Sequence, residues 1–170
     1  PAPNLIDQGS ERSRPFPVIC ECTMNIDVLR KFNLLEVTIE PDTTLLEEDG
    51  RESKVYVLVA GSVKISSKGY ELAQVDDVGT ILGEISALLG TANVATVTTV
   101  EQSTFFVVEN FQQFVLEHPE VAVSVAQVLA VRLINMNNHL VHVKDGLSNL
   151  QSSLEGYLPV FPERPEDLQS

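Results

Sequence analysis

The stretch that decides the fold is GTILGEISALLGTANVATV, residues 79–97. It opens with a turn glycine and the end of a strand, and Gly83 then lets backbone approach a ligand closely. Residues 84–89 lack strand alternation and lie between two glycines, which predicts a short helix. The first N–H groups of such a helix attract an anion. Glu84, at its start, can accept a hydrogen bond from a sugar hydroxyl.

Short β-rich runs flank this stretch on both sides. They lie at residues 37–39, 55–65 with a break at Gly61, 94–100 and 104–108. Turn residues such as Asp-Gly and Lys-Gly separate them. Many short strands between turns predict a mainly β domain with flanking helices, built as an antiparallel β-roll or jelly roll (a double-stranded β-helix).

Helical patterns lie outside the β region. Asn25 is a candidate N-cap for a short helix over residues 25–36. Residues 111–117 suit a hinge helix, and one long C-terminal helix runs from Glu120 to about Glu155, where Gly156 can cap it.

Proline and charge mark the expected segments. Residues 1–17 read as a flexible lead-in, residues 18–119 as the β-roll with its N-terminal helix, residues 120–156 as a long dimerisation helix, and residues 157–170 as a flexible tail.

The long helix carries apolar residues at alternating steps of four and three, a period of 3.5 that is typical of a coiled coil. These residues are Leu129, Leu133, Met136, Leu140, Val143, Leu147, Leu150 and Leu154. One interpretation packs the helix along its own domain or onto residues outside this chain. The other, which we favour, is a parallel two-helix coiled coil in a homodimer, although Gly146 weakens the helix by roughly 1 kcal/mol relative to alanine.

The net charge of −13 argues against direct nucleic-acid binding, because the eleven basic residues form no cluster. The acidic balance also disfavours a membrane surface, and no apolar run approaches the roughly 20 residues of a transmembrane helix. We therefore expect a cytoplasmic protein without membrane insertion.

Metal binding and catalysis are not indicated. Cys20 and Cys22 alone cannot complete a zinc site, and His118, His139 and His142 lie far away in the sequence without a matching carboxylate or thiol. No nucleophile with an adjacent base is recognisable, so we expect no catalytic residues, no metal and no enzymatic activity.

Residues 79–97 resemble the phosphate-binding cassette of cyclic nucleotide-binding domains, which occur in catabolite activator proteins, protein kinase A regulatory subunits and cyclic-nucleotide-gated channels. In the kinase subunits the cassette reads Gly-Glu-Leu-Ala-Leu-Ile-Tyr-Gly-Thr-Pro-Arg-Ala-Ala-Thr-Val. The residues that match it identically, without a gap, are Gly83, Glu84, Gly90, Thr91, Ala95, Thr96 and Val97. The resemblance extends through the 55–65 hairpin, the hinge helix and the long helix, and covers about residues 25–145.

The resemblance implies a ligand site for cAMP or cGMP and no certain cofactor. Glu84 would hold the ribose 2′-hydroxyl, and the amides of Ile85, Ser86 and Val94 would face the cyclic phosphate. The expected site set is Gly83, Glu84, Ile85, Ser86, Asn93, Val94, Ala95 and Asn137.

The main departure from the family pattern is Asn93, which stands where the family has its phosphate-binding arginine. A charge-assisted bond is worth about 1.5–3 kcal/mol, so its loss predicts roughly 10- to 100-fold weaker binding. The chain has no Lys or Arg between Lys68 and Arg132. An anionic ligand would therefore depend on backbone dipoles or on distant cations such as Lys64, Lys68 or Lys144 of the partner subunit.

Dimeric members of the family read the base with side chains of the long helix. Aligning their Ala-Arg-Arg-Leu segment on residues 130–133 places Met136 and Asn137 at those positions. Asn137 can bond a purine edge, whereas Met136 fits the apolar seam better. The alternative is that both are simple helix residues.

Three functions follow from the resemblance. The first is a non-enzymatic regulatory sensor that binds cAMP, cGMP or a related small ligand and signals through the hinge and the long helix. The second is a degenerate domain that no longer binds nucleotide and serves dimerisation or protein contact. The third is the effector half of a transcription regulator without its helix-turn-helix, since residues 157–170 are too short and acidic to form one.

Overall fold

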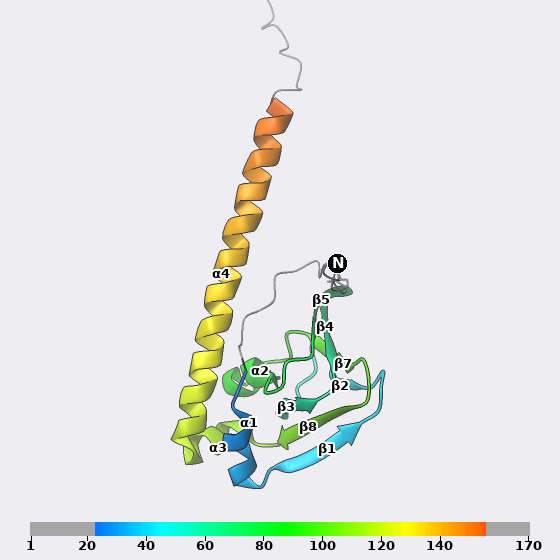
Figure 1. The fold of residues 1–170 in the computed structure, drawn as a ribbon, viewed down its shortest axis with the longest axis vertical. Coiled ribbons are helices and arrows are strands. Elements are labelled where there is room, and N and C mark those ends of the chain that lie inside the picture. The colour runs from blue at the N-terminus through cyan, green and yellow to red at the C-terminus, as the bar shows by residue number, and fades with distance from the viewer. Residues whose placement is uncertain (1–22, 156–170) are drawn as a thin grey trace, which may run out of the picture. The chain divides into compact units, whose positions relative to one another are not determined.

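A computed structural model of the protein describes residues 23–155 (Figure 1). The chain divides into two compact units, one ending at Arg132 and the other beginning at Leu133, and each is treated separately below. The predicted segments 1–17 and 157–170, the cysteine pair and the Gly156 cap lie outside the described residues. The predicted segment boundaries stay predictions.

The first unit contains eight strands and the short helices. The strands are β1 (Leu35–Ile39), β2 (Thr44–Leu46), β3 (Val55–Ala60), β4 (Val63–Ser67), β5 (Tyr70–Val75), β6 (Ile81–Leu82), β7 (Thr96–Thr99) and β8 (Ser103–Val108). The helices are α1 (Ile26–Leu29), the 3-10 helix η1 (Arg30–Phe32), α2 (Glu84–Leu89), α3 (Phe111–Glu117) and α4 (Pro119–Glu155), which continues into the second unit.

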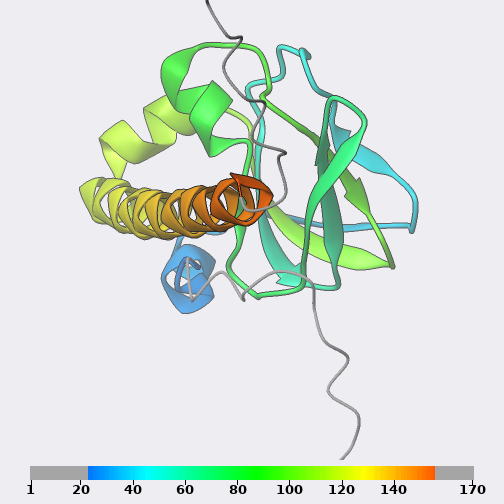
Figure 2. The ribbon, with the colours of Figure 1, turned by 90° about the horizontal axis from the view of Figure 1, so that it is seen from above.

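Two four-stranded antiparallel sheets form the β-roll. The first has the order β1-β8-β3-β6 and the second the order β2-β7-β4-β5. Figure 2 shows the sheets on one side of the unit and α2 and α3 beside them. This arrangement confirms the predicted mainly β architecture with flanking helices.

The chain passes from the first sheet to the second through the turn after β3. Gly61 has φ +98°, and a Cβ there would lie 2.2 Å from the Oγ of Ser103. That hydroxyl accepts a hydrogen bond from the backbone N–H of Ser62 at 3.1 Å. The turn therefore requires glycine, which explains why the predicted 55–65 strand breaks at this residue.

The first sheet separates two apolar cores because successive side chains of a strand point to opposite faces. On β8, Phe106 packs into the core that the helices cover, whereas Phe105 packs into the core between the sheets. On β3, Val57 and Leu58 divide in the same way. The helix-side core includes Ala87 of α2 and so couples the cassette helix to the sheet.

The N-terminal helix is shorter than predicted. Asn25 is its N-cap and accepts a hydrogen bond from the N–H of Asp27 at 2.9 Å. The helical segment ends at Phe32 because Asn33 adopts a left-handed conformation with φ 49°. Leu35 and Glu36, which we expected in the helix, begin β1 instead.

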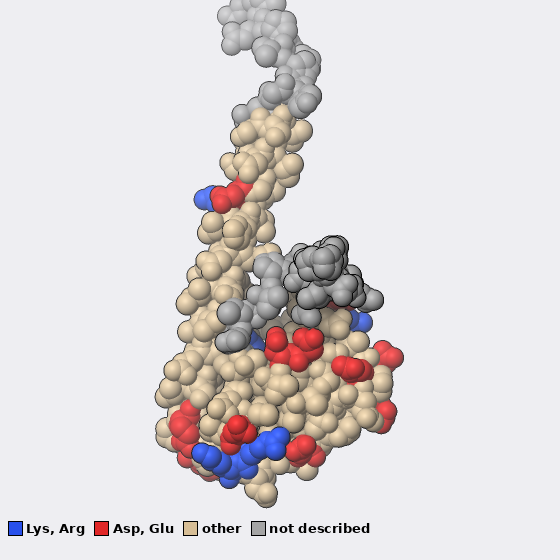
Figure 3. All heavy atoms as spheres, in the orientation of Figure 1, with Lys and Arg blue, Asp and Glu red and all other residues tan. Residues whose placement is uncertain are grey.

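The second unit consists, among described residues, of the continuation of α4 from Leu133 to Glu155. Only Lys144 and Asp145 are charged between Leu133 and Leu154, and Figure 3 shows a long, almost uncharged helix surface. By length and composition alone, Pro119–Leu154 could cross a membrane, with a mean hydropathy of 1.3 in its most apolar window. The same helix supplies Val121, among others, to the helix-side core.

Candidate functional site

The predicted cassette folds as β6, the helix α2 and β7, so the short helix expected over residues 84–89 is confirmed. Gly83 caps its start with φ 85°, and a Cβ there would lie 2.9 Å from both Leu46 Cδ1 and the carbonyl oxygen of Lys54. Gly90 ends the helix with φ 65°. Gly83 is therefore required both by its backbone conformation and by the lack of room for a Cβ. Gly90 is required by its backbone conformation alone.

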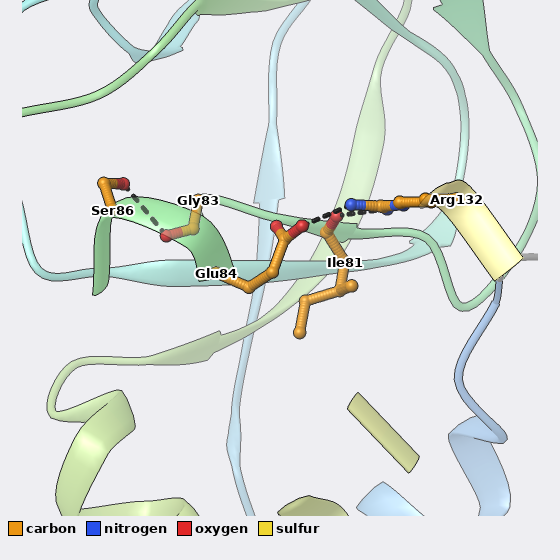
Figure 4. Close-up of polar contacts among 5 residues, drawn as sticks. All are labelled: Ile81, Gly83, Glu84, Ser86 and Arg132. Carbon is orange, nitrogen blue, oxygen red and sulfur yellow. Dashed lines mark hydrogen bonds and ion pairs between the residues drawn. The ribbon is translucent and has the colours of Figure 1, made fainter. Parts of the chain in front are cut away.

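Glu84 points from the start of α2 toward α4 (Figure 4). It is 2% exposed, and its carboxylate forms an ion pair with Arg132, whose Nη1 donates to Glu84 Oε1. The second guanidinium nitrogen, Nη2, donates to the backbone oxygen of Ile81 at 2.8 Å. Arg132 therefore joins α4 to both β6 and α2.

The pKa of the Glu84 carboxyl is raised above its ordinary value. Burial is the main cause, because it penalises the charged form, and the positive charge of Arg132 offsets part of this effect. A hydrogen bond from the backbone N–H of Glu84 also favours the carboxylate. Arg132 is therefore what makes a charged group tolerable at this position.

Asn93 is 4% exposed, and both polar atoms of its side chain have partners. Its Nδ2 donates to the carbonyl oxygen of Glu47 at 3.1 Å, and its Oδ1 accepts from the hydroxyl of Ser86 at 2.8 Å. Its backbone N–H donates to Gly50 at 2.8 Å, and its carbonyl accepts from the N–H of Asp49 at 2.9 Å. Asn93 ties the cassette to the loop between β2 and β3.

Gly50 completes this contact. A Cβ at Gly50 would lie 2.9 Å from the carbonyl oxygen of Glu47 and 3.3 Å from Asn93 Nδ2. The loop can therefore close over the asparagine side chain only where no larger residue intervenes. The residue at the position of the family's arginine is held inside the fold.

The other predicted ligand residues lie in different surroundings. Ile85 and Val94 are 37% and 60% exposed, and Ala95 is half-buried. Asn137 is exposed and belongs to the second unit, so its predicted contact with a base stays a prediction.

Sequence reasoning missed Arg132 as a member of this site. We expected the cassette to lie in a stretch without cations, because the chain has no Lys or Arg between Lys68 and Arg132. The fold brings Arg132 to Glu84 from 48 residues away. The signal was nevertheless present, since the Ala-Arg-Arg-Leu segment of the family aligns its second arginine with Arg132. The pair adds no net positive charge to the pocket, because the two charges cancel.

Within residues 23–155 no three His, Cys, Asp or Glu side chains are grouped as a metal site would require. Leu88 of α2 is half-buried against the helix-side core, and Leu89 is 69% exposed.

Comparison with protein families gives a match over residues 36–118 to the family described as "Cyclic nucleotide-binding domain". Comparison with curated proteins gives no match.

Several solved structures share the fold. The catabolite activator protein of Thermus thermophilus is 19% identical, with a TM-score of 0.59, over 70% of this chain and 58% of its own. A cyclic nucleotide-binding domain from Methylobacillus flagellatus is 20% identical, with a TM-score of 0.59, over 69% of this chain and 73% of its own. The N-terminal domain of a Streptomyces coelicolor transcriptional regulator is 24% identical, with a TM-score of 0.50, over 66% of this chain and 84% of its own.

Replacing Asn93 tests its structural role. We expect Asn93→Ala to lower the free energy of unfolding by about 1–2 kcal/mol, because the Glu47 carbonyl loses its side-chain donor and the Ser86 hydroxyl keeps only the Gly83 carbonyl as acceptor. Urea denaturation followed by circular dichroism measures this change. Asn138→Ala, at an exposed position on α4, is the control and should change stability by less than about 0.5 kcal/mol. Equal stability of both variants would contradict the role given to Asn93.

Proposed function

Because residues 36–118 form a domain of the cyclic nucleotide-binding family, we propose that this chain is a non-enzymatic, cytoplasmic regulatory domain that binds a cyclic nucleotide weakly through the sugar. The observation that carries the proposal is the buried ion pair of Glu84 and Arg132 in the cassette. A ribose hydroxyl can donate to Glu84, and the positive charge of Arg132 favours the carboxylate form that accepts this hydrogen bond.

The phosphate contributes little in this proposal. In the described structure Asn93 directs its side chain to Glu47 and Ser86 and not to a ligand. A cyclic phosphate would face only the backbone amides that the family resemblance assigns to Ile85, Ser86 and Val94. Without the charge-assisted bond of the arginine, we expect affinity roughly 10- to 100-fold below that of a complete cassette.

A signal from the cassette has a physical route to the helices. The amide of Gln112 on α3 donates to the carbonyl oxygen of Leu88 on α2 at 3.2 Å. Ala87 of α2, Phe111 of α3 and Val125 of α4 share the helix-side core. A ligand that shifts α2 therefore changes the packing of α3 and the start of α4.

A second candidate function is supported by the Asn93 contacts. If the closed arrangement of Asn93, Glu47 and Ser86 is permanent, the domain no longer takes nucleotide and serves protein contact or dimerisation. An effector half of a transcription regulator would use the same domain and needs a DNA-binding segment elsewhere in its chain.

Titration calorimetry with cAMP, cGMP and the phosphate-free nucleosides adenosine and guanosine separates these candidates. We expect dissociation constants in the high micromolar to millimolar range. A cyclic nucleotide should bind less than about tenfold more tightly than its nucleoside, because the phosphate has no cationic partner. Glu84→Gln should weaken the binding of both the cyclic nucleotide and its nucleoside. Glu36→Gln, a change at an exposed position on β1, should weaken neither. Absence of heat with every ligand at millimolar concentration would reject nucleotide binding and leave the second candidate.

We further propose that α4 pairs with α4 of a second copy. Of the eight apolar residues that repeat every 3.5 positions along α4, the seven from Leu133 to Leu154 are between 46% and 70% exposed. The eighth, Leu129, is half-buried against the helix-side core of its own unit. Asn, His, Ser and Gln dominate the other faces, so the apolar residues form a stripe and not an all-apolar surface. A 3.5-residue stripe of this kind is buried by a second helix of the same sequence.

Sedimentation equilibrium tests this pairing. We expect twice the chain mass of 18.7 kDa. Leu140→Glu should give the monomer, because it would bury a charge in the seam, whereas Asn138→Glu, on another face of the helix, should remain dimeric. A monomeric parent chain, or a Leu140→Glu variant with unchanged mass, would contradict the proposal.

A further inference from the structure

A cavity of about 220 Å³ lies between the loop that joins β2 to β3, the helix α2 and the start of α3. The loop contributes Arg51, Glu52 and Ser53 to its wall, and the C-terminal end of α2 contributes Thr91. The side chain of Phe111 supplies an apolar part of the lining. The cavity therefore combines both signs of charge, hydroxyl groups and a small apolar surface.

This cavity borders the cassette, because Ser86, Ala87, Gly90 and Thr91 line it, but it does not include the proposed sugar contact. Glu84, Asn93 and Arg132 do not line it, and Ser86, which does, is buried with its hydroxyl bonded to Asn93. A ligand here would leave the sugar-binding carboxylate untouched. The inference consequently stands whether or not the cassette takes a nucleotide.

Arg51 and Glu52 are the charged groups of the cavity, and both are exposed. Neither forms an ion pair with any residue of the described range 23–155, although they are neighbours in the chain. By contrast Lys54, three residues after Arg51, lies 3.9 Å from the carboxylate of Glu109. One cation and one anion in the same wall leave the cavity without net charge.

We propose that the cavity is a binding site for a compact zwitterion, a free α-amino acid. The planar guanidinium of Arg51 matches a carboxylate with two parallel hydrogen bonds, which a lysine cannot offer. The carboxylate of Glu52 accepts hydrogen bonds from the ammonium group. The Ser53 hydroxyl, which donates to the carbonyl oxygen of Glu109 at 3.3 Å, can accept another, and the Thr91 hydroxyl can donate or accept. Ala87 and Phe111 receive the side chain, so a small or medium ligand fits best.

Occupancy of this site acts on the elements that carry a signal in the proposed function. The wall includes Gln112 of α3, whose amide already bonds to the carbonyl of Leu88 on α2. A bound amino acid touches both helices and the β2–β3 loop at once. It therefore favours the arrangement in which α2 and α3 are held together.

The experiment measures the melting temperature of the full chain by circular dichroism with each of the twenty protein amino acids at 10 mM. A site with a Kd of roughly 1 mM should raise Tm by about 3–6 °C with at least one of them. The amide of that amino acid lacks the carboxylate, and its deaminated acid lacks the ammonium. Both should give less than about a third of the shift.

Two variants place the effect in the cavity. Arg51→Gln and Glu52→Gln should each abolish the shift, whereas Lys54→Gln, in the same loop but outside this cavity, should retain it. The proposal is overturned if no amino acid raises Tm, if the deaminated acid acts as well as the amino acid, or if the shift persists in Arg51→Gln.

Discussion

A carboxylate buried at the start of a short helix needs a positive partner, and here that partner comes from a helix 48 residues further along the chain. The Glu84 carboxylate is buried and the Arg132 side chain only partly exposed, so their attraction holds the cassette, β6 and the first part of α4 in one arrangement. Through this pair and the bond to Ile81, one arginine of α4 joins both the cassette helix and β6, and the proposed sugar contact depends on it.

The second consequence concerns the phosphate. In place of an arginine directed to a ligand, the chain has Asn93, directed into the β2–β3 loop. The cassette has its expected helix and carboxylate, and at the position where the resemblance places an arginine Asn93 makes a contact within the fold. In the function that we propose, the domain responds to a sugar more than to a phosphate, and the cavity with Arg51 and Glu52 is a second site beside the same helices.

Much of the fold could be predicted because its signals are local. Glycines in the cassette and at the 55–65 turn have positive φ or no room for a Cβ, and short runs of β-branched residues mark β3 and β8. The end of the first helix could not be read, because it depends on a left-handed Asn33. Nor could the role of Asn93 and the partnership of Arg132, since both depend on contacts between residues distant in sequence.

The ion pair is tested most directly by the pH dependence of unfolding in Arg132→Met. The folded-state pKa of Glu84 is already raised, so its stabilising contribution is present at low pH and is lost as pH rises through that pKa. Without Arg132 the pKa of Glu84 rises further in the folded state, so the stability that is lost on raising the pH becomes larger. We predict that Arg132→Met lowers the free energy of unfolding by about 2–3 kcal/mol at pH 7 and by less near pH 4. When Glu84→Gln is also present, the effect of Arg132→Met should depend little on pH. An equal cost at both pH values, or none, would contradict the account.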